Sequence, residues 1–165
     1  MSSLYLWIKF IHVVAGITFI MGHGAAIAFA FRVKKETAVE RVRAMLDLSG
    51  SMWPVYMLSW LTLMIAGIVN GFMHKLWSQG WIWVSLVLFI AITIWMFTLG
   101  YRTYHPLRKA FGLPYQKGKE EMPAEDPLPE QERAALIAAT RPVELLAVGY
   151  GGFILILWLM IFKPF

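Results

Sequence analysis

The chain has 165 residues, of which 59% are hydrophobic and only 15% are charged, and its formal net charge is +5. Soluble domains usually carry about 25% charged residues, so this composition excludes an ordinary water-soluble protein. The absence of cysteine also excludes disulfides and thiolate metal ligands.

Four long segments contain no Asp, Glu, Lys or Arg: Phe10–Phe31, Leu48–His74, Leu76–Tyr101 and Leu145–Phe162. A helix needs about 20 apolar residues to cross the hydrocarbon core of a bilayer. We therefore predict an all-α integral membrane four-helix bundle, a single transmembrane domain over residues 1–165, with spans at about 4–32, 53–75, 80–103 and 142–162. The first span is expected to stay in the mature protein, because its apolar run is longer than a signal-peptide core and basic residues follow it.

Twelve of the fifteen Lys and Arg residues lie in two groups, one after the first span and one between the third and fourth spans. The two groups are Arg32, Lys34, Lys35, Arg41 and Arg43, and Arg102, Arg108, Lys109, Lys117, Lys119, Arg133 and Arg141. The positive-inside rule makes both loops, about 33–52 and 104–141, cytoplasmic, with both termini outside. We expect a multi-pass protein of the bacterial inner membrane, embedded in lipid, with no nucleic-acid partner.

The two cytoplasmic loops have different patterns. Residues 33–52 carry apolar side chains at helical spacing, which predicts a short interfacial helix, and Pro54 suits the first turn of the next span. In the longer loop, His105-Pro106 predicts a turn, and the charged, proline-rich stretch after it predicts an extended linker. A further short helix is predicted at 130–140.

Two histidines lie within the first span. His12 and His23 are eleven residues apart, almost three helical turns, so they share one face and are separated by about 16 Å along the axis. Gly16 and Phe19 lie on the same stripe. Histidine within lipid normally faces the bundle interior, and inward histidines beside small residues are how helical bundles hold haem. Helix-contact roles without any ligand are the alternative.

The depths of the histidines predict their partners. His74 ends the second span at the outer side, close to the level of His12, so these two form the preferred pair of axial ligands. His105 lies about 18 Å from the level of His23 by helix rise, which disfavours a pair between them. A second haem at His23 would then need methionine, another side chain or a neighbouring subunit as its partner.

Residues 5–22, YLWIKFIHVVAGITFIMG, resemble the first helix of a bacterial membrane superfamily that includes the copper-resistance D family, HemJ-type protoporphyrinogen oxidases and small membrane proteins of unknown function. The shared features are Trp7, Lys9 and His12 followed by Gly16, and the similarity extends more diffusely over about residues 4–110. In the HemJ-type enzymes a histidine of this motif is implicated with b-type haem, which by resemblance points to His12. Those enzymes carry a lysine in the third helix where this chain has Ser85, which does not favour protoporphyrinogen oxidation.

The sequence therefore predicts a membrane protein that binds b-type haem, one or two per chain, and transfers electrons beside a quinone or a respiratory-complex subunit. Its predicted cofactor-binding residues are His12, His74, His23 and Gly16. Two other functions stay open. One is copper handling, with His12, His23 and methionines as a permeation path, and the other is an accessory subunit without a cofactor. His12, His74 and His23 are the predicted metal-binding residues. A homo-oligomer is compatible with all three, and whether the protein is an enzyme is left open.

Overall fold

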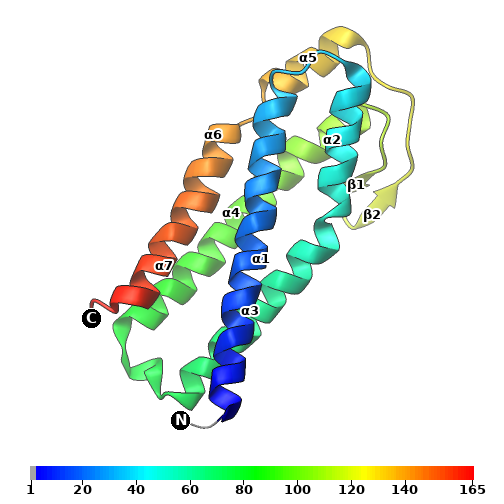
Figure 1. Ribbon diagram of the computed structural model, residues 1–165. Coiled ribbons are helices and arrows are strands. Elements are labelled where there is room, and N and C mark those ends of the chain that lie inside the picture. Colours follow the sequence, from blue (N-terminus) through cyan, green and yellow to red (C-terminus); the bar gives the residue numbers. More distant parts are fainter. Residues whose placement is uncertain (1–2) are drawn as a thin grey trace.

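The computed structural model describes residues 3–165. Four helical stretches in it are long and apolar enough to cross a membrane, which confirms the predicted all-α membrane architecture. They are α1 (Ser3–Val33); α2 and α3 (Val39–Ser51 and Trp53–Met73); α4 (Gly80–Ala110); and the stretch from α5 (Glu130–Ala138) through α6 (Pro142–Glu144) and η2 (Leu145–Gly151) to α7 (Gly152–Phe162). Figure 1 shows them side by side, with α1 packed chiefly on α3 and α4 on α7.

The outer surface of the bundle is apolar. Side chains such as Leu58, Ile94 and Ile161 are more than 60% exposed although each lies within a span. A helix that faces hydrocarbon satisfies its backbone polar groups internally and presents apolar side chains outward. This surface is therefore expected to face lipid.

A short break at Met52 separates α2 from α3, and Pro54 lies in the first turn of α3 as predicted. Proline is tolerated there because the amide that it lacks would have no partner within the helix. The expected helix in the first loop is confirmed as α2, whose Val42 and Leu46 are buried.

We call the assembly of α2, the connection 34–38 and residues 104–141 the cap. Its core is a cluster of buried apolar side chains: Val33, Val42, Leu46, Leu107, Ala110, Phe111 and Leu113. Arg108 links the end of α4 to α2 and to the segment that follows α4. Its guanidinium donates to the carbonyl oxygens of Leu46 (2.7 Å) and Pro114 (2.7 Å) and lies 3.5 Å from the carboxylate of Asp47.

The predicted turn at His105-Pro106 is wrong. Helix α4 continues through both residues to Ala110, with Pro106 inside it. An internal proline removes one backbone hydrogen bond, but Leu107 and Ala110 are both 0% exposed in the cap core, and this packing outweighs the local preference for a turn.

The long loop contains more structure than the predicted extended linker. A small antiparallel hairpin pairs β1 (Tyr115–Lys117) with β2 (Glu120–Met122), and Gly118 in its turn has a positive φ of 67°. The predicted helix at 130–140 is confirmed as α5, which packs against α4.

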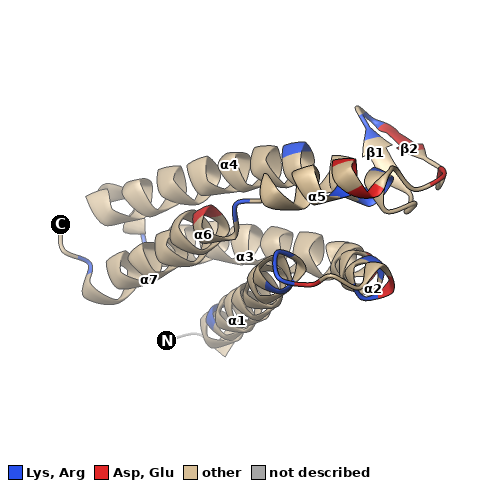
Figure 2. Ribbon diagram, turned by 90° about the horizontal axis from the view of Figure 1, so that it is seen from above, with Lys and Arg blue, Asp and Glu red and all other residues tan. Residues whose placement is uncertain are grey.

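Both described ends of the chain lie at the end of the bundle opposite the cap (Figure 1); we call it the terminal end. A 3₁₀ turn, Leu76–Ser78, joins α3 to α4 there. Figure 2 shows charged residues gathered over the connection between α1 and α2, over α2, over α5 and over the hairpin, with few along α3, α4 and α7. The grouping of basic residues on one side is as the sequence predicts.

Candidate functional site

A cavity of about 670 Å³ opens within the terminal end of the bundle, between α1, α3, α4 and α7. Most of its lining is apolar, including Leu63, Phe89 and Phe153. A smaller set of lining residues is polar or aromatic with a polar atom: Tyr5, Lys9, His12, Asn70, His74, Trp77, Trp81, Ser85 and Lys163. Small-molecule and cofactor sites usually have about 300–1,000 Å³ of mostly apolar space with a few placed polar groups.

Helix α1 contributes one continuous stripe to this cavity. Tyr5, Lys9, His12 and Gly16 follow one another at spacings of three or four residues and all line it. Residues at these spacings lie on one face of an α-helix. From the terminal end inward, the stripe therefore presents the phenol of Tyr5, the ammonium of Lys9, the imidazole of His12 and the small surface of Gly16.

The imidazole of His12 is oriented by α3. Its Nδ1 lies 3.0 Å from the carbonyl oxygen of Leu63, and because a carbonyl can only accept, Nδ1 carries the hydrogen. In the neutral ring the lone pair then resides on Nε2, which has no hydrogen-bond partner within residues 3–165. Gly67 makes room for the ring, since a Cβ there would lie 3.0 Å from Cε1 of His12. Metal-binding histidines are commonly oriented in this way, by a backbone carbonyl on the other ring nitrogen.

His74 lies at the C-terminal cap of α3 and lines the same cavity as His12. Its ring packs against Tyr5, with ring centroids 3.9 Å apart. His12 is level with Gly67, so about 10 Å of helix rise separates its level from that of His74. The structure thus brings both predicted ligands to one cavity, with His74 nearer its outer mouth.

Gly16, also predicted from the sequence, is buried and lines the cavity. A Cβ at this position would meet Leu63 at 3.5 Å and Phe153 at 3.8 Å, which are ordinary contacts. The space beside Gly16 would therefore accept a methyl group.

Two buried polar atoms in the cavity lining lack partners within the described chain. They are Oδ1 of Asn70 and Nε1 of Trp77. Buried polar groups are nearly always hydrogen-bonded, so these two atoms are candidate contacts for a molecule bound in the cavity. The sequence did not identify Trp77 as a site residue, because a tryptophan at the end of a span is also typical of the aromatic belt.

His23 lies on α1 outside this cavity. Its ring packs against η2, which is a π-helical stretch. Its Nε2 is buried and has no partner among residues 3–165, and a Cβ at Gly149 would lie only 2.0 Å from it. On its other side the ring stacks on Phe19 at a centroid distance of 6.3 Å. Single π-helical turns occur often at functional sites, and here the turn presents glycine to the imidazole.

His105 belongs to the cap, where its Nδ1 accepts a hydrogen bond of 3.1 Å from the amide of Gln116. In residues 3–165 there is no group of three or more His, Asp or Glu side chains placed to hold a metal ion.

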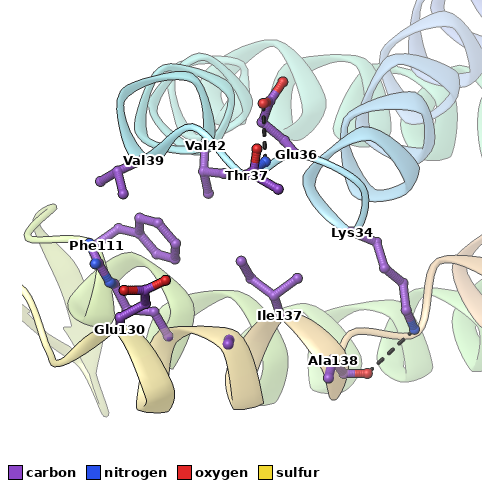
Figure 3. Close-up of a pocket in the computed structure, with 11 residues that line it drawn as sticks. Lys34, Glu36, Thr37, Val39, Val42, Phe111, Glu130, Ile137 and Ala138 are labelled. Carbon is purple, nitrogen blue, oxygen red and sulfur yellow. Dashed lines mark hydrogen bonds between the residues drawn. The ribbon is translucent and has the colours of Figure 1, made fainter.

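A second cavity, of about 540 Å³, lies in the cap between the connection 34–38, α2, α5 and the end of α4. Two of the four charged side chains that line it, Lys34 and Glu36, are hydrogen-bonded to the backbone of the protein itself (Figure 3). Lys34 donates to the carbonyls of Ala138 (3.4 Å) and Thr140 (2.9 Å), and Glu36 accepts from the amides of Thr37 and Ala38 (both 3.1 Å). The Lys34 bonds tie the connection to the end of α5, and the Glu36 bonds fix the backbone of the connection just before α2 begins at Val39.

The fold and the interior cavity define the class of this molecule as an integral membrane protein with four apolar helical spans. The chain belongs to the family described as predicted integral membrane protein (DUF2269), whose model matches residues 6–164. Among the curated proteins and the solved structures, none matches this chain.

Proposed function

We propose that this protein binds b-type haem in the cavity at the terminal end and acts in electron transfer. The observation that carries the proposal is His12, a half-buried imidazole whose Nδ1 is held by Leu63 while Nε2 is left for a ligand. The resemblance of residues 5–22 to helices in which a histidine is implicated with haem adds independent support for the same residue.

The residues that line the cavity have distinct roles in this proposal. His12 would hold the group through Nε2, because its Nδ1 is bonded to the carbonyl of Leu63. His74, which lines the same cavity, would be the second residue to hold the group, and this requires a shift that closes the separation of about 10 Å in helix rise between the two histidines. The apolar side chains exclude water and lower the local dielectric, so they tune the potential at which an electron is held. The haem, when bound, supplies the one-electron chemistry.

The proposal retains the orientation and location predicted from the sequence. The positive-inside rule places the cap in the cytoplasm and the cavity near the outer face of a bacterial inner membrane. A cavity at that depth is suited to exchange electrons with a carrier in the outer leaflet or at the outer surface.

The test is an absorption spectrum of the protein purified in detergent and then reconstituted with haem. We expect a Soret band with reducible α and β bands in the wild type, loss of haem in His12→Ala, and an altered spectrum in His74→Ala. His105→Ala is the matched control, because His105 lies in the cap and should leave the spectrum unchanged. Equal haem content in wild type and His12→Ala, or no haem binding by the wild type, would refute the proposal.

A quinol is the second candidate ligand of the same cavity. The observation that favours it is the pair of unpartnered atoms, one acceptor on Asn70 and one donor on Trp77, since a quinol ring carries hydroxyl groups that both donate and accept. Quenching of tryptophan fluorescence by a short-chain quinol, lost in Asn70→Leu and kept in His12→Ala, would support this candidate over haem.

A further inference from the structure

The basic residues at the terminal end are few, and two of them line the cavity. Only Lys9, Lys75 and Lys163 lie outside the two basic groups of the sequence. Lys9 and Lys163 both line the cavity, one from α1 and one directly after α7, whereas Lys75 is not part of the lining. Two lysines from distant parts of the sequence therefore line one cavity.

Neither lysine is neutralised by the protein. All ten Asp and Glu residues lie within residues 36–47 and 120–144, in the cap or at the start of the fourth span. Across residues 3–165, the ion pairs do not involve Lys9 or Lys163. Their ammonium groups lie instead over aromatic rings, that of Lys9 5.9 Å from the ring of Tyr5 and that of Lys163 5.6 Å from the ring of Trp81.

The position of Lys163 is set by backbone geometry. It is the C-terminal cap of α7 and adopts a left-handed conformation with φ of 46°, which turns the chain back toward α4. The amide of Trp81 then donates to the carbonyl of Phe165 at 3.2 Å, and Phe165 packs beside Gly80. This closure holds Lys163 at the mouth of the cavity, above the buried ring of Trp81.

The cavity therefore combines an apolar interior with two lysines at its mouth that make no ion pair among residues 3–165. The stripe on α1 places Lys9 one turn outward from His12, about 4.5 Å along the axis. Charge-assisted hydrogen bonds to carboxylates are about twice as strong as neutral ones, and they are stronger still near a low-dielectric interior. A ligand that matches this cavity has a flat apolar body reaching His12 and acidic groups directed to the mouth.

We propose that Lys9 and Lys163 form a carboxylate-binding site that recognises the two propionate groups of the bound porphyrin. The inference rests on the proposed haem function and extends it, because it assigns the orientation of the ligand, with the propionates directed outward and the apolar edge inward. A quinol lacks carboxylates and would leave both lysines unpaired, so the lysines favour haem over the second candidate.

The experiment compares haem with its dimethyl ester, in which both propionates are uncharged. Each is titrated into the purified full-length protein, and its affinity is measured from the Soret shift and from quenching of tryptophan fluorescence. We expect haem to bind at least tenfold more tightly than the ester, with an advantage that falls at high salt, because screening weakens charge pairs at an exposed mouth. Each of Lys9→Gln and Lys163→Gln should reduce haem affinity about tenfold, the effect of one charge-assisted hydrogen bond, without changing affinity for the ester.

Lys75→Gln is the matched control, since it removes a positive charge at the same end outside the cavity, and Lys9→Arg should retain the preference for haem. Equal affinity of the wild type for haem and ester would overturn the inference while leaving the haem function intact. Failure of the wild type to bind either porphyrin would instead refute the haem function, and the inference with it.

Discussion

The two cavities of this molecule have similar volumes but differ in how their polar groups are hydrogen-bonded. In the cap cavity, Lys34 and Glu36 are bonded to backbone groups of the protein itself. In the cavity at the terminal end, Asn70 and Trp77 each leave a buried polar atom without a partner within the described residues. Buried polar groups stabilise a fold when satisfied and cost free energy when they are not. We therefore assign the stabilising role to the cap and keep the cavity at the terminal end as the proposed ligand site.

The largest effect that would test this comparison is expected in the cap core. Leu107 is 0% exposed, and truncation of a buried leucine to alanine usually costs about 2–5 kcal/mol. Leu107→Ala should therefore lower the free energy of unfolding by about this amount, measured by circular dichroism during denaturation in detergent. Ile94→Ala, at a lipid-facing side chain that is 62% exposed, should change it by less than about 1 kcal/mol. Equal losses in both variants would show that the cap is not the stabilising region.

The next effect is expected at the contact between α1 and η2. A methyl group at Gly149 would lie 2.0 Å from Nε2 of His23, and overpacking of this kind usually costs about 1–3 kcal/mol. Gly149→Ala should therefore be destabilising, whereas Gly24→Ala, with nothing within 4 Å of the added methyl, should not be. Combining Gly149→Ala with His23→Ala should recover part of the loss, and a strictly additive double variant would contradict the proposed clash.

A smaller effect is expected from acid on the cap. The hydrogen bond from the amide of Ala38, followed by that from Thr37 and the charges of Arg41 and Arg32, holds the pKa of Glu36 below its ordinary value of 4.5. Because the pKa is lowered in the folded state, its stabilising contribution is present above about pH 4.5 and is lost as the pH falls through the folded pKa. A carbon NMR titration of the carboxyl group should give a midpoint below 4.5.

The matching variant is Glu36→Gln, which should remove this part of the acid sensitivity of the cap. The measurement is the rate at which an acid protease cleaves the connection 34–38 as the pH is lowered. The exposed Glu40 provides the control, and Glu40→Gln should retain the sensitivity. Identical acid profiles for wild type and Glu36→Gln would contradict the role assigned to Glu36.

The smallest effect on stability is expected in the cavity at the terminal end. Trp77→Phe removes an unsatisfied buried donor, which is favourable, and also some ring packing against Phe72 and Trp83, which is unfavourable. Because the two effects oppose each other, the unfolding free energy of the ligand-free protein should fall by less than about 0.5 kcal/mol. Trp60→Phe is the control, because its Nε1 donates to Thr93 at 3.2 Å and loss of that bond should cost about 0.5–1.5 kcal/mol. A larger loss for Trp77→Phe than for Trp60→Phe would show that the cavity contributes to stability as the cap does.

Much of the fold could be predicted from the sequence, because its causes are local. Uninterrupted apolar runs specify the spans, and the spacing of Val42 and Leu46 specifies α2. The common location of His12 and His74 also follows from the alternating direction of successive spans.

Other features depend on contacts between distant segments. The continuation of α4 past Pro106 follows from the burial of Leu107 against α2, and the π-helical turn at η2 follows from the room that His23 requires. The presence of Lys9 and Lys163 in the lining of one cavity also depends on packing between distant segments. The spacing of Lys9 and His12, which share a helix face, is the one local pattern that could have predicted a lysine beside the cavity.

The length of α4 sets the height of the cap above the bilayer. Its uncharged part, Gly80–Tyr101, rises about 33 Å, close to the roughly 30 Å of a hydrocarbon core. The remaining turns, from Arg102 to Ala110, add about 12 Å, which lifts the cap core through the headgroup layer into water. The hairpin turn at Gly118, where nothing lies within 4 Å of an added side chain, is then accessible to an antibody. An epitope inserted at this turn would report which side of the membrane the cap faces.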